Sequence, residues 1–289
     1  MVFLNGKFLP IEEAKVPVLD RGFIFGDGVY ELVPVYSRVA FRVDEHLARL
    51  ERSLAEARIR NPYTRAQWRE LIYRLVDAQP LEDQSVYFQV TRGVAKRDHS
   101  FPKDTEPTVF MMSNPLVTPA KETVQKGAAA VSARDNRWLR CDIKSISLFG
   151  NCLLRQLSAE AGAAETILIR DGRLTEASAS NVFVVKRGVI LSPPKSHLIL
   201  PGITYDVVVE LARANGLPLE LRDVSEAELR EADEIWVSSS SKEVLAIVTL
   251  DGAQVGDGRP GPLFARMYQL YQEFKQKVMR SGNREAVSV

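Results

Sequence analysis

Two residues of this 289-residue chain, Lys144 and Glu176, indicate most clearly which chemistry it could perform. Lys144 lies between Ile143 and Ser145, and a lysine among apolar neighbours can lose its proton and attack a carbonyl carbon. Glu176 follows later in the chain, and a carboxylate against a pyridine nitrogen keeps that ring protonated and electron-withdrawing. Together they are the two halves of a pyridoxal phosphate site, which would also need a phosphate cradle and a grip on the substrate.

The local sequence pattern leaves the burial of Lys144 open. Residues 143–148 (Ile-Lys-Ser-Ile-Ser-Leu) mix apolar and polar side chains, and this pattern does not show whether Lys144 is buried. Most lysines are solvated surface residues. A solvated strand lysine therefore stands as the alternative to a buried, imine-forming one.

Two segments have the composition of a phosphate cradle. Residues 201–204 (Pro-Gly-Ile-Thr) lead into a predicted helix, where backbone N–H groups and a threonine hydroxyl suit a dianion, although an ordinary helix cap is the alternative. Residues 238–241 are four serines after a predicted strand, and they could wrap an anion or form only a polar loop. Arg49, on another predicted helix, could add positive charge, although a helical arginine is usually solvated.

A substrate carboxylate could be held by residues 92–99, which follow a predicted strand and are dense in hydrogen-bond donors. They include Arg97, Asp98 and His99, and arginine binds carboxylates through two parallel hydrogen bonds. A charged surface loop is the alternative. Residues 20–31 contain three closely spaced glycines and predict only a tight turn into a strand.

Composition narrows the class of protein. The length favours two domains or one large one, and the net charge of +1 supports neither nucleic-acid nor membrane-surface binding. The two cysteines, Cys141 and Cys152, are too few for a disulfide framework and predict a reducing cytoplasm. We expect no signal peptide, no membrane span and no metal, since the sequence has no long apolar run and no ligand cluster with metal-binding spacing.

The hydrophobic patterns predict strands and helices mixed without regular alternation, which is typical of an α+β fold. Residues 114–123, with two prolines, are the expected link between domains 1–116 and 117–289, and the tail 281–289 is expected to be loose. Predicted strands lie near 2–9, 28–36, 85–92, 108–112, 128–132, 166–169, 182–185, 189–191, 234–238 and 245–250. Predicted helices lie near 44–58, 64–78, 148–161, 204–214, 226–231 and 262–279.

Taken in order, these segments resemble the class IV, or fold-type IV, pyridoxal phosphate-dependent aminotransferases, from about residue 3 to about residue 275. The family signature Glu-x-Ser-x-x-Asn-apolar-aromatic is met by residues 176–183, and its later part, Gly-apolar-Thr, by residues 202–204. Tyr205 departs from the signature, which usually continues with Lys or Arg, and we expect at most a weaker cofactor grip.

Within the family, residues 20–31, 87–93 and 137–145 resemble the members that act on D-amino acids. Arg97 and His99 are similar to the Arg-x-His carboxylate trap of those members, which Tyr30 completes and which branched-chain and chorismate-directed relatives lack. The resemblance implies a small N-terminal α/β domain and a larger C-terminal domain with a barrel-like sheet. It also implies a homodimer in which the trap residues reach the neighbouring active site.

The resemblance further implies pyridoxal 5′-phosphate as the cofactor, with Lys144 as its Schiff-base lysine and Glu176 as the partner of its pyridine nitrogen. The implied reaction is transamination between D-amino acids and 2-oxo acids. Branched-chain L-amino acid or (R)-amine transamination, aminodeoxychorismate cleavage and a non-catalytic pyridoxal phosphate-binding protein are the alternatives on this scaffold. The implied phosphate contacts are Arg49, Ile203, Thr204, Ser239 and Ser240, with Leu200 against the ring.

Overall fold

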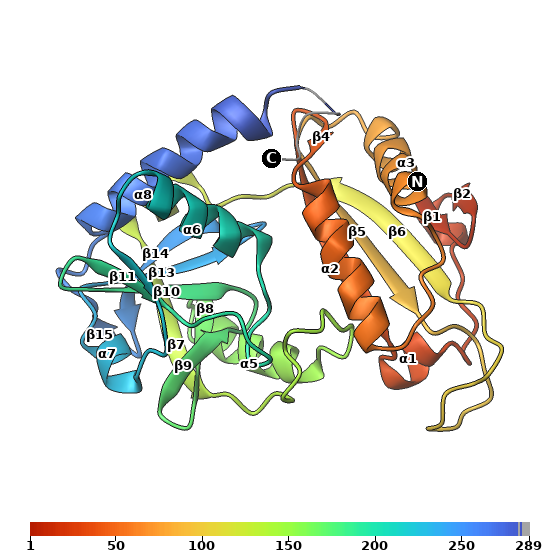
Figure 1. Cartoon of the computed structure of the whole chain (residues 1–289), viewed down its shortest axis with the longest axis horizontal. Coiled ribbons are helices and arrows are strands. Elements are labelled where there is room, and N and C mark those ends of the chain that lie inside the picture. The colour runs from red at the N-terminus through yellow and green to blue at the C-terminus, as the bar shows by residue number, and fades with distance from the viewer. Residues whose placement is uncertain (283, 285–289) are drawn as a thin grey trace. The chain divides into compact units, whose positions relative to one another are not determined.

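A computed structural model describes residues 1–282 and 284 of the chain and contains helices and strands in mixed order, which confirms the α+β class (Figure 1). The chain forms two compact units. The first takes Met1–Leu116, Ile143–Leu148 and the segment from Gln276, and the second takes Val117–Asp142 and Phe149–Lys275. The tail that we expected to be loose lies largely outside the described residues.

Ile143–Leu148, which the sequence placed within 117–289, packs with the first unit. The reason is local pairing, because the backbone N–H of Tyr30 donates to the carbonyl oxygen of Lys144 at 2.9 Å. Ile143 adds its side chain to the core of that unit. The segment that carries Lys144 is thus held by the N-terminal part of the chain, while the two predicted domain ranges stay a proposal.

The first unit is built on a six-stranded antiparallel sheet in the order β2-β1-β6-β5-β3-β4. The strands are β1 (Val2–Leu4), β2 (Lys7–Leu9), β3 (Gly28–Tyr36), β4 (Val39–Ala40), β5 (Gln84–Thr91) and β6 (Thr108–Pro115). The helices are α1 (Arg21–Phe25), α2 (Val43–Glu56) and α3 (Arg65–Asp77), with a short 3₁₀ turn η1 (Ile11–Glu13).

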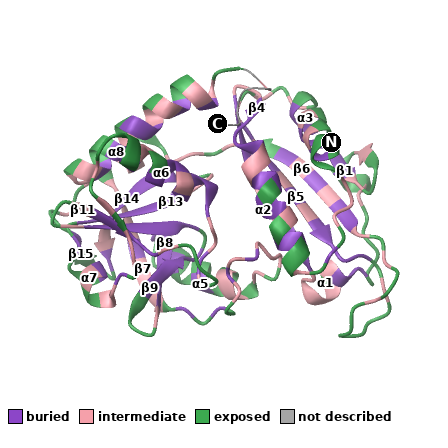
Figure 2. Ribbon diagram, viewed as in Figure 1, coloured by how far each residue is buried: buried purple, intermediate pink, exposed green. Residues whose placement is uncertain are grey.

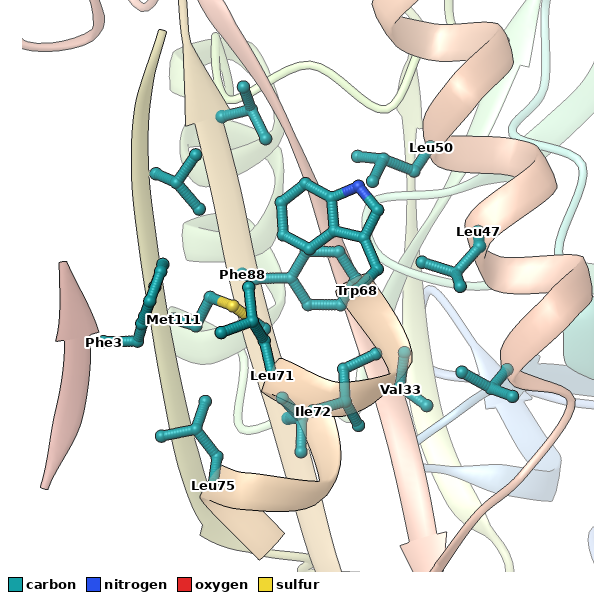
Figure 3. Packing of buried hydrophobic residues seen from close by; sticks show 14 of the residues in the cluster. Phe3, Val33, Leu47, Leu50, Trp68, Leu71, Ile72, Leu75, Phe88 and Met111 are labelled. Atoms are coloured by element: carbon teal, nitrogen blue, oxygen red, sulfur yellow. The ribbon is translucent and has the colours of Figure 1, made fainter. Parts of the chain in front are cut away.

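The core of this unit lies between the sheet and helices α2 and α3 (Figure 3). Alternate residues of the strands face it, as expected for a sheet with one covered face. Trp68 of α3 and Phe88 of β5 are fully buried, and their rings stack with centroids 5.3 Å apart. Leu47 and Leu50 of α2 complete the same cluster, so the apolar face of α2 is fixed against β3.

The second unit contains a nine-stranded sheet in the order β12-β11-β10-β13-β14-β7-β8-β9, with β15 paired to β14, curled into a half-barrel. The strands are β7 (Ala128–Arg134), β8 (Glu165–Arg170), β9 (Arg173–Ala177), β10 (Asn181–Lys186), β11 (Val189–Ser192), β12 (Leu219–Leu221), β13 (Glu234–Ser239), β14 (Glu243–Leu250) and β15 (Ala253–Gln254). The helices are α4 (Lys121–Lys126), α5 (Phe149–Glu160), α6 (Ile203–Ala214), α7 (Glu226–Arg230) and α8 (Pro262–Phe274).

The central strands β10 and β13 are buried on both faces (Figure 2). On one face Phe183 and Trp236 pack against aromatic residues of helices α6 and α8. On the other, Val182 and Val237 join an aliphatic cluster. This two-sided burial explains why these strands are continuous apolar runs in the sequence.

Several elements differ from the sequence predictions. No helix or strand was expected at β4, β9, β12 and β15 or at α4, which begins within the expected link 114–123. Residues 20–31, expected to be only a turn into a strand, contain helix α1 before β3. The helix expected at 262–279 is α-helical only to Phe274 and continues as a π-helical turn, η2 (Lys275–Met279). Within residues 1–282 and 284, no helix combines the length and the apolar character that crossing a bilayer requires.

Candidate active site

Lys144 is held beside strand β3 of the first unit. Its backbone N–H donates to Ser53 Oγ at 3.2 Å and its carbonyl oxygen accepts from Tyr30. Its Nζ lies 4.1 Å from the centroid of the Tyr30 ring. The Lys144 side chain is half-buried. The structure therefore brings two of the predicted site residues, Lys144 and Tyr30, into contact.

Arg49, predicted at the phosphate, lies near the middle of α2 in a buried ion pair. Its Nε and Nη2 donate to the two carboxylate oxygens of Glu31 at 2.7 and 2.8 Å, and His46 Nδ1 lies 2.8 Å from Glu31 Oε2. Burial alone would raise the pKa of Glu31, but the charge of Arg49 and the hydrogen bonds from Arg49 and His46 together lower it. Burial lowers the pKa of His46, which favours its neutral form.

Sequence reasoning missed Glu31 and His46. The available signal was the spacing of His46 and Arg49, which places both on one face of a helix. Glu31 could be found only by pairing β3 with that helix. The consequence is that Arg49 is oriented by a carboxylate that has no exposed surface.

The predicted trap residues Arg97 and His99 lie on the exposed loop between β5 and β6. Both contact Phe25, with Arg97 Cζ 5.4 Å from the ring centroid and the His99 ring centroid at 5.6 Å. Within residues 1–282 and 284, neither makes a hydrogen bond or ring contact with Tyr30. Asp98 Oδ1 accepts from the Ser100 N–H at 2.8 Å, so this carboxylate turns to its own loop.

Glu176 lies at the end of β9 in the second unit and is 4% exposed. Its Oε1 accepts from Arg137 Nη1 at 2.7 Å, and its Oε2 accepts from the Leu200 N–H at 3.0 Å and Asn181 Nδ2 at 3.2 Å. Burial raises the pKa of Glu176 to about 7, against the opposing effects of Arg137 and the Leu200 N–H. The residue is therefore a buried acid that can exchange a proton near neutral pH.

Arg137 is a further functional residue that sequence reasoning missed. Its Nε and Nη2 donate to the two oxygens of Asp135, each at 2.9 Å, while Nη1 reaches Glu176. Arg170 and Thr175 also bind Asp135, which is itself buried. Burial would raise the pKa of Asp135, but the hydrogen bonds and charge of Arg137 lower it to about 2. Asp135 thus fixes the guanidinium that binds Glu176.

The first phosphate candidate lies at the start of α6. Gly202 is the N-cap of this helix, and Ile203 and Thr204 form its buried first turn. A Cβ atom added to Gly202 would lie 2.1 Å from Asn181 Oδ1. The same Asn181 donates to the Leu200 carbonyl oxygen at 2.9 Å. Asn181 therefore ties the helix start to Glu176, and the glycine is required by this close approach.

The second candidate follows β13. The backbone N–H of Lys242 donates to Ser239 Oγ at 3.1 Å, which closes the turn that contains Ser240. Lys242 Nζ pairs with Glu165 Oε2 at 3.0 Å, and Ser180 Oγ donates to the same oxygen at 2.9 Å. The serine turn is thereby joined to the segment that follows Glu176.

Comparison with known proteins identifies the family. Residues 28–250 match the family described as Amino-transferase class IV. The chain belongs to this family. It is 43% identical over 262 residues to a D-alanine aminotransferase of Bacillus licheniformis, covering 91% of this chain and 92% of the relative. It is 39% identical over 274 residues to a D-alanine aminotransferase of Staphylococcus aureus (strain MW2), covering 94% and 97%.

Solved structures agree with this assignment. The branched-chain amino acid aminotransferase of Escherichia coli matches with a TM-score of 0.88 and 24% identity over 99% of this chain and 97% of that one, which shows the fold alone. A hypothetical aminotransferase from Mycobacterium tuberculosis, solved in its PLP-bound form, matches with a TM-score of 0.81 and 25% identity over 94% and 97%. The expected fold-type IV architecture is confirmed.

In this class IV aminotransferase, Tyr205 does not take the role of the basic residue that it replaces. Its side chain is 2% exposed, its ring stacks on Phe183 at 5.2 Å and its hydroxyl donates to the Pro193 carbonyl oxygen at 3.0 Å. The tyrosine is a core residue of the second unit. The weaker cofactor grip stays a prediction.

The residues of each unit fit pyridoxal 5′-phosphate, the cofactor that the family implies. Lys144 offers an amine and Glu176 a buried acid for the ring nitrogen. Six buried side-chain polar atoms have no hydrogen-bond partner among residues 1–282 and 284, and two of them belong to neighbours of predicted phosphate contacts: Nε2 of His46, whose ring lies beside Arg49, and Oγ of Ser238, next to Ser239. Residues 1–282 and 284 contain no cluster of three or more His, Cys, Asp or Glu side chains that could hold a metal ion.

Proposed function

We propose that this aminotransferase uses pyridoxal 5′-phosphate to transfer amino groups between D-amino acids and 2-oxo acids. The observation that carries the proposal is the environment of Glu176, a buried carboxyl whose pKa is near 7 and which accepts hydrogen bonds from Arg137, Asn181 and Leu200. The relatives named D-alanine aminotransferase support the D-amino acid class of substrate.

Lys144 Nζ would hold the cofactor and, once released, move the α-proton of the substrate as a general base and acid. When bound, the cofactor supplies an electron sink for the negative charge that develops at the α-carbon. Glu176 would keep a proton on the pyridine nitrogen, because its carboxylate, whose charge Arg137 supports, pairs with the protonated ring and not with the neutral one. Arg49, Ile203, Thr204, Ser239 and Ser240 are the proposed phosphate contacts, with Leu200 against the ring.

Handedness would follow from where the substrate carboxylate is bound. Lys144 Nζ would remove the α-proton from one face of the substrate. The side on which the carboxylate is bound would therefore decide which enantiomer has its α-proton directed at Nζ. We propose Arg97, His99 and Tyr30 as the carboxylate trap, with the planar guanidinium making parallel hydrogen bonds.

A homodimer would assemble this trap, since Arg97 and His99 contact Phe25 rather than Tyr30 within one chain. Helix α5 supports a dimer through three apolar side chains at i, i+4 and i+8. These are Phe149, Leu153 and Leu157, which are 78%, 54% and 45% exposed. An exposed apolar stripe of this kind is typical of a surface that another protein surface covers.

The test is a half-reaction absorbance screen on the purified protein. We expect a yellow protein that loses its colour with D-alanine and keeps it with L-alanine. Equal bleaching by L-alanine would contradict the stereochemical assignment. Bleaching by L-leucine or by a simple amine alone would favour the branched-chain or amine reaction, and a colourless protein that binds no added cofactor would contradict the proposal as a whole.

A further inference from the structure

Helix α1 lies immediately before β3 and is tightly fixed for so short an element. Asp20 caps it by accepting from the Gly22 N–H at 2.8 Å, and it ends at Gly26 in the left-handed conformation, with φ of 65°. A Cβ atom added to Gly22 would lie 2.3 Å from Thr91 Cγ2. The position of α1 is therefore set by its contact with the end of β5, where the loop with Arg97 and His99 begins.

Phe25, the last residue of α1, is the common contact of the two trap side chains. The Arg97 guanidinium carbon lies 5.4 Å from its ring centroid, and the His99 ring lies 5.6 Å away at an interplanar angle of 38°. Both trap residues are otherwise on an exposed loop. A cation over an aromatic face and a tilted ring pair are both attractive geometries.

Arg21 fixes the backbone of the same loop. Its Nη1 donates to the Asp98 carbonyl oxygen at 2.5 Å, and its Nε pairs with Asp27 at 2.7 Å. Asp27 also pairs with Arg92 at 2.8 Å, and the Arg21 guanidinium carbon lies 4.8 Å from the Phe25 ring centroid. The same Nη1 donates to the Ser100 carbonyl oxygen at 3.4 Å, so Arg21 holds the loop at the residue between Arg97 and His99 and at the residue after His99.

We propose that Phe25, supported by Arg21, is a positioning platform that holds Arg97 and His99 ready for the substrate carboxylate. The inference rests on the proposed function, in which these two residues bind that carboxylate. A flexible arginine and histidine on an exposed loop lose side-chain entropy when they bind a ligand, and contacts made before binding reduce this cost. The Asp98 carboxylate does not compete with the substrate carboxylate for Arg97 and His99, because it accepts the Ser100 N–H of its own loop.

The platform acts on binding rather than on the chemical step. Phe25→Leu removes the ring but keeps an apolar side chain, so we expect KM for D-alanine to rise about 5- to 10-fold, with kcat changed by less than about twofold. Phe25→Tyr keeps the ring face and should restore KM to within about twofold of wild type. Phe23→Leu is the matched control, because Phe23 lies on the same helix and is 75% exposed.

The decisive measurement is a double-mutant cycle on the cofactor-loaded enzyme, with kcat/KM for D-alanine as the readout. In the Arg97→Ala/His99→Ala background, Phe25→Leu should change kcat/KM by less than about twofold, because the two side chains that Phe25 contacts have been removed. The same loss in both backgrounds, or an unchanged KM for Phe25→Leu alone, would overturn the platform. The melting temperature and cofactor absorbance of each variant check folding, and Phe25→Met is a second ring-free variant.

The cycle separates this inference from the proposed function. If Arg97→Ala/His99→Ala leaves KM for D-alanine unchanged, the trap itself is wrong and the function proposal fails at that point. If that double variant raises KM strongly while Phe25→Leu does not, the trap stands and only the platform is refuted.

Discussion

Arg137→Met is the variant that most directly tests how the pKa of Glu176 is set. The substitution keeps much of the side-chain volume and removes the guanidinium that donates to Glu176 Oε1 at 2.7 Å. Glu176 would keep its hydrogen bonds from Leu200 and Asn181 and lose its ion-pair partner. The change also removes two hydrogen bonds from Asp135, which would still pair with Arg170 at 3.1 Å and accept from Thr175 Oγ1 at 2.8 Å.

The expected effect follows from the strength of that one contact. A hydrogen bond to a charged group contributes about 1.5–3 kcal/mol, and about 1.4 kcal/mol corresponds to one pKa unit. The pKa of Glu176, raised to about 7 by burial and opposed by Arg137, should therefore rise by about one to two further units in the variant. Glu176 would then be mostly protonated at neutral pH and unable to keep a proton on a pyridine nitrogen.

The assay is the pH dependence of kcat/KM for a D-amino acid, measured on cofactor-loaded wild type and Arg137→Met. Because the ionised carboxylate is the active form, we expect the acidic limb of the variant's profile to move to higher pH by about one to two units. Arg170→Met is the matched control, since Arg170 binds Asp135 within the same network but, in the part of the chain that the structure describes, makes no hydrogen bond with Glu176. An acidic limb that stays in place in Arg137→Met would refute the reasoning.

Three further predictions concern stability and assembly. Lys242→Met leaves the fully buried Glu165 without its cation and should lower the free energy of unfolding by about 3–5 kcal/mol in chemical denaturation. Lys195→Met, which removes an ion pair whose lysine is 47% exposed, should cost less than about 1 kcal/mol, and equal losses would contradict the argument. The folded-state pKa of Glu176, about 7, exceeds its ordinary value of 4.5, so protonation of Glu176 stabilises the folded, cofactor-free protein. This contribution to the free energy of unfolding should be about 3 kcal/mol below pH 4.5 and should be lost as the pH rises to about 7. Melting temperatures of wild type and Glu176→Gln should therefore diverge over that pH range, and parallel curves would disprove the raised pKa. Leu153→Asp on α5 should convert a dimer to a monomer in sedimentation velocity, whereas an unchanged species would exclude the α5 stripe as the dimer surface.

Local sequence pattern was sufficient for much of the fold. Strands such as β10 and β13 are short apolar runs, and α2 and α3 repeat their apolar residues with helical period, so each element carries its own signal. Helix α1 escaped this reasoning because five residues are too few for a period. It is defined instead by the Asp20 cap and by the contact of Gly22 with Thr91, which lies far along the chain.

The sequence by itself determined the α+β class, the family and the identities of candidate residues such as Lys144 and Glu176, because these depend on residue type, spacing and order. Only the tertiary structure decided their surroundings: Tyr30 beside Lys144, and Arg137 on Glu176. It also turned Asp98 to its own loop and Tyr205 into the core. The physical reason is that burial and electrostatic contacts depend on distances in space, and here they join residues far apart in the chain.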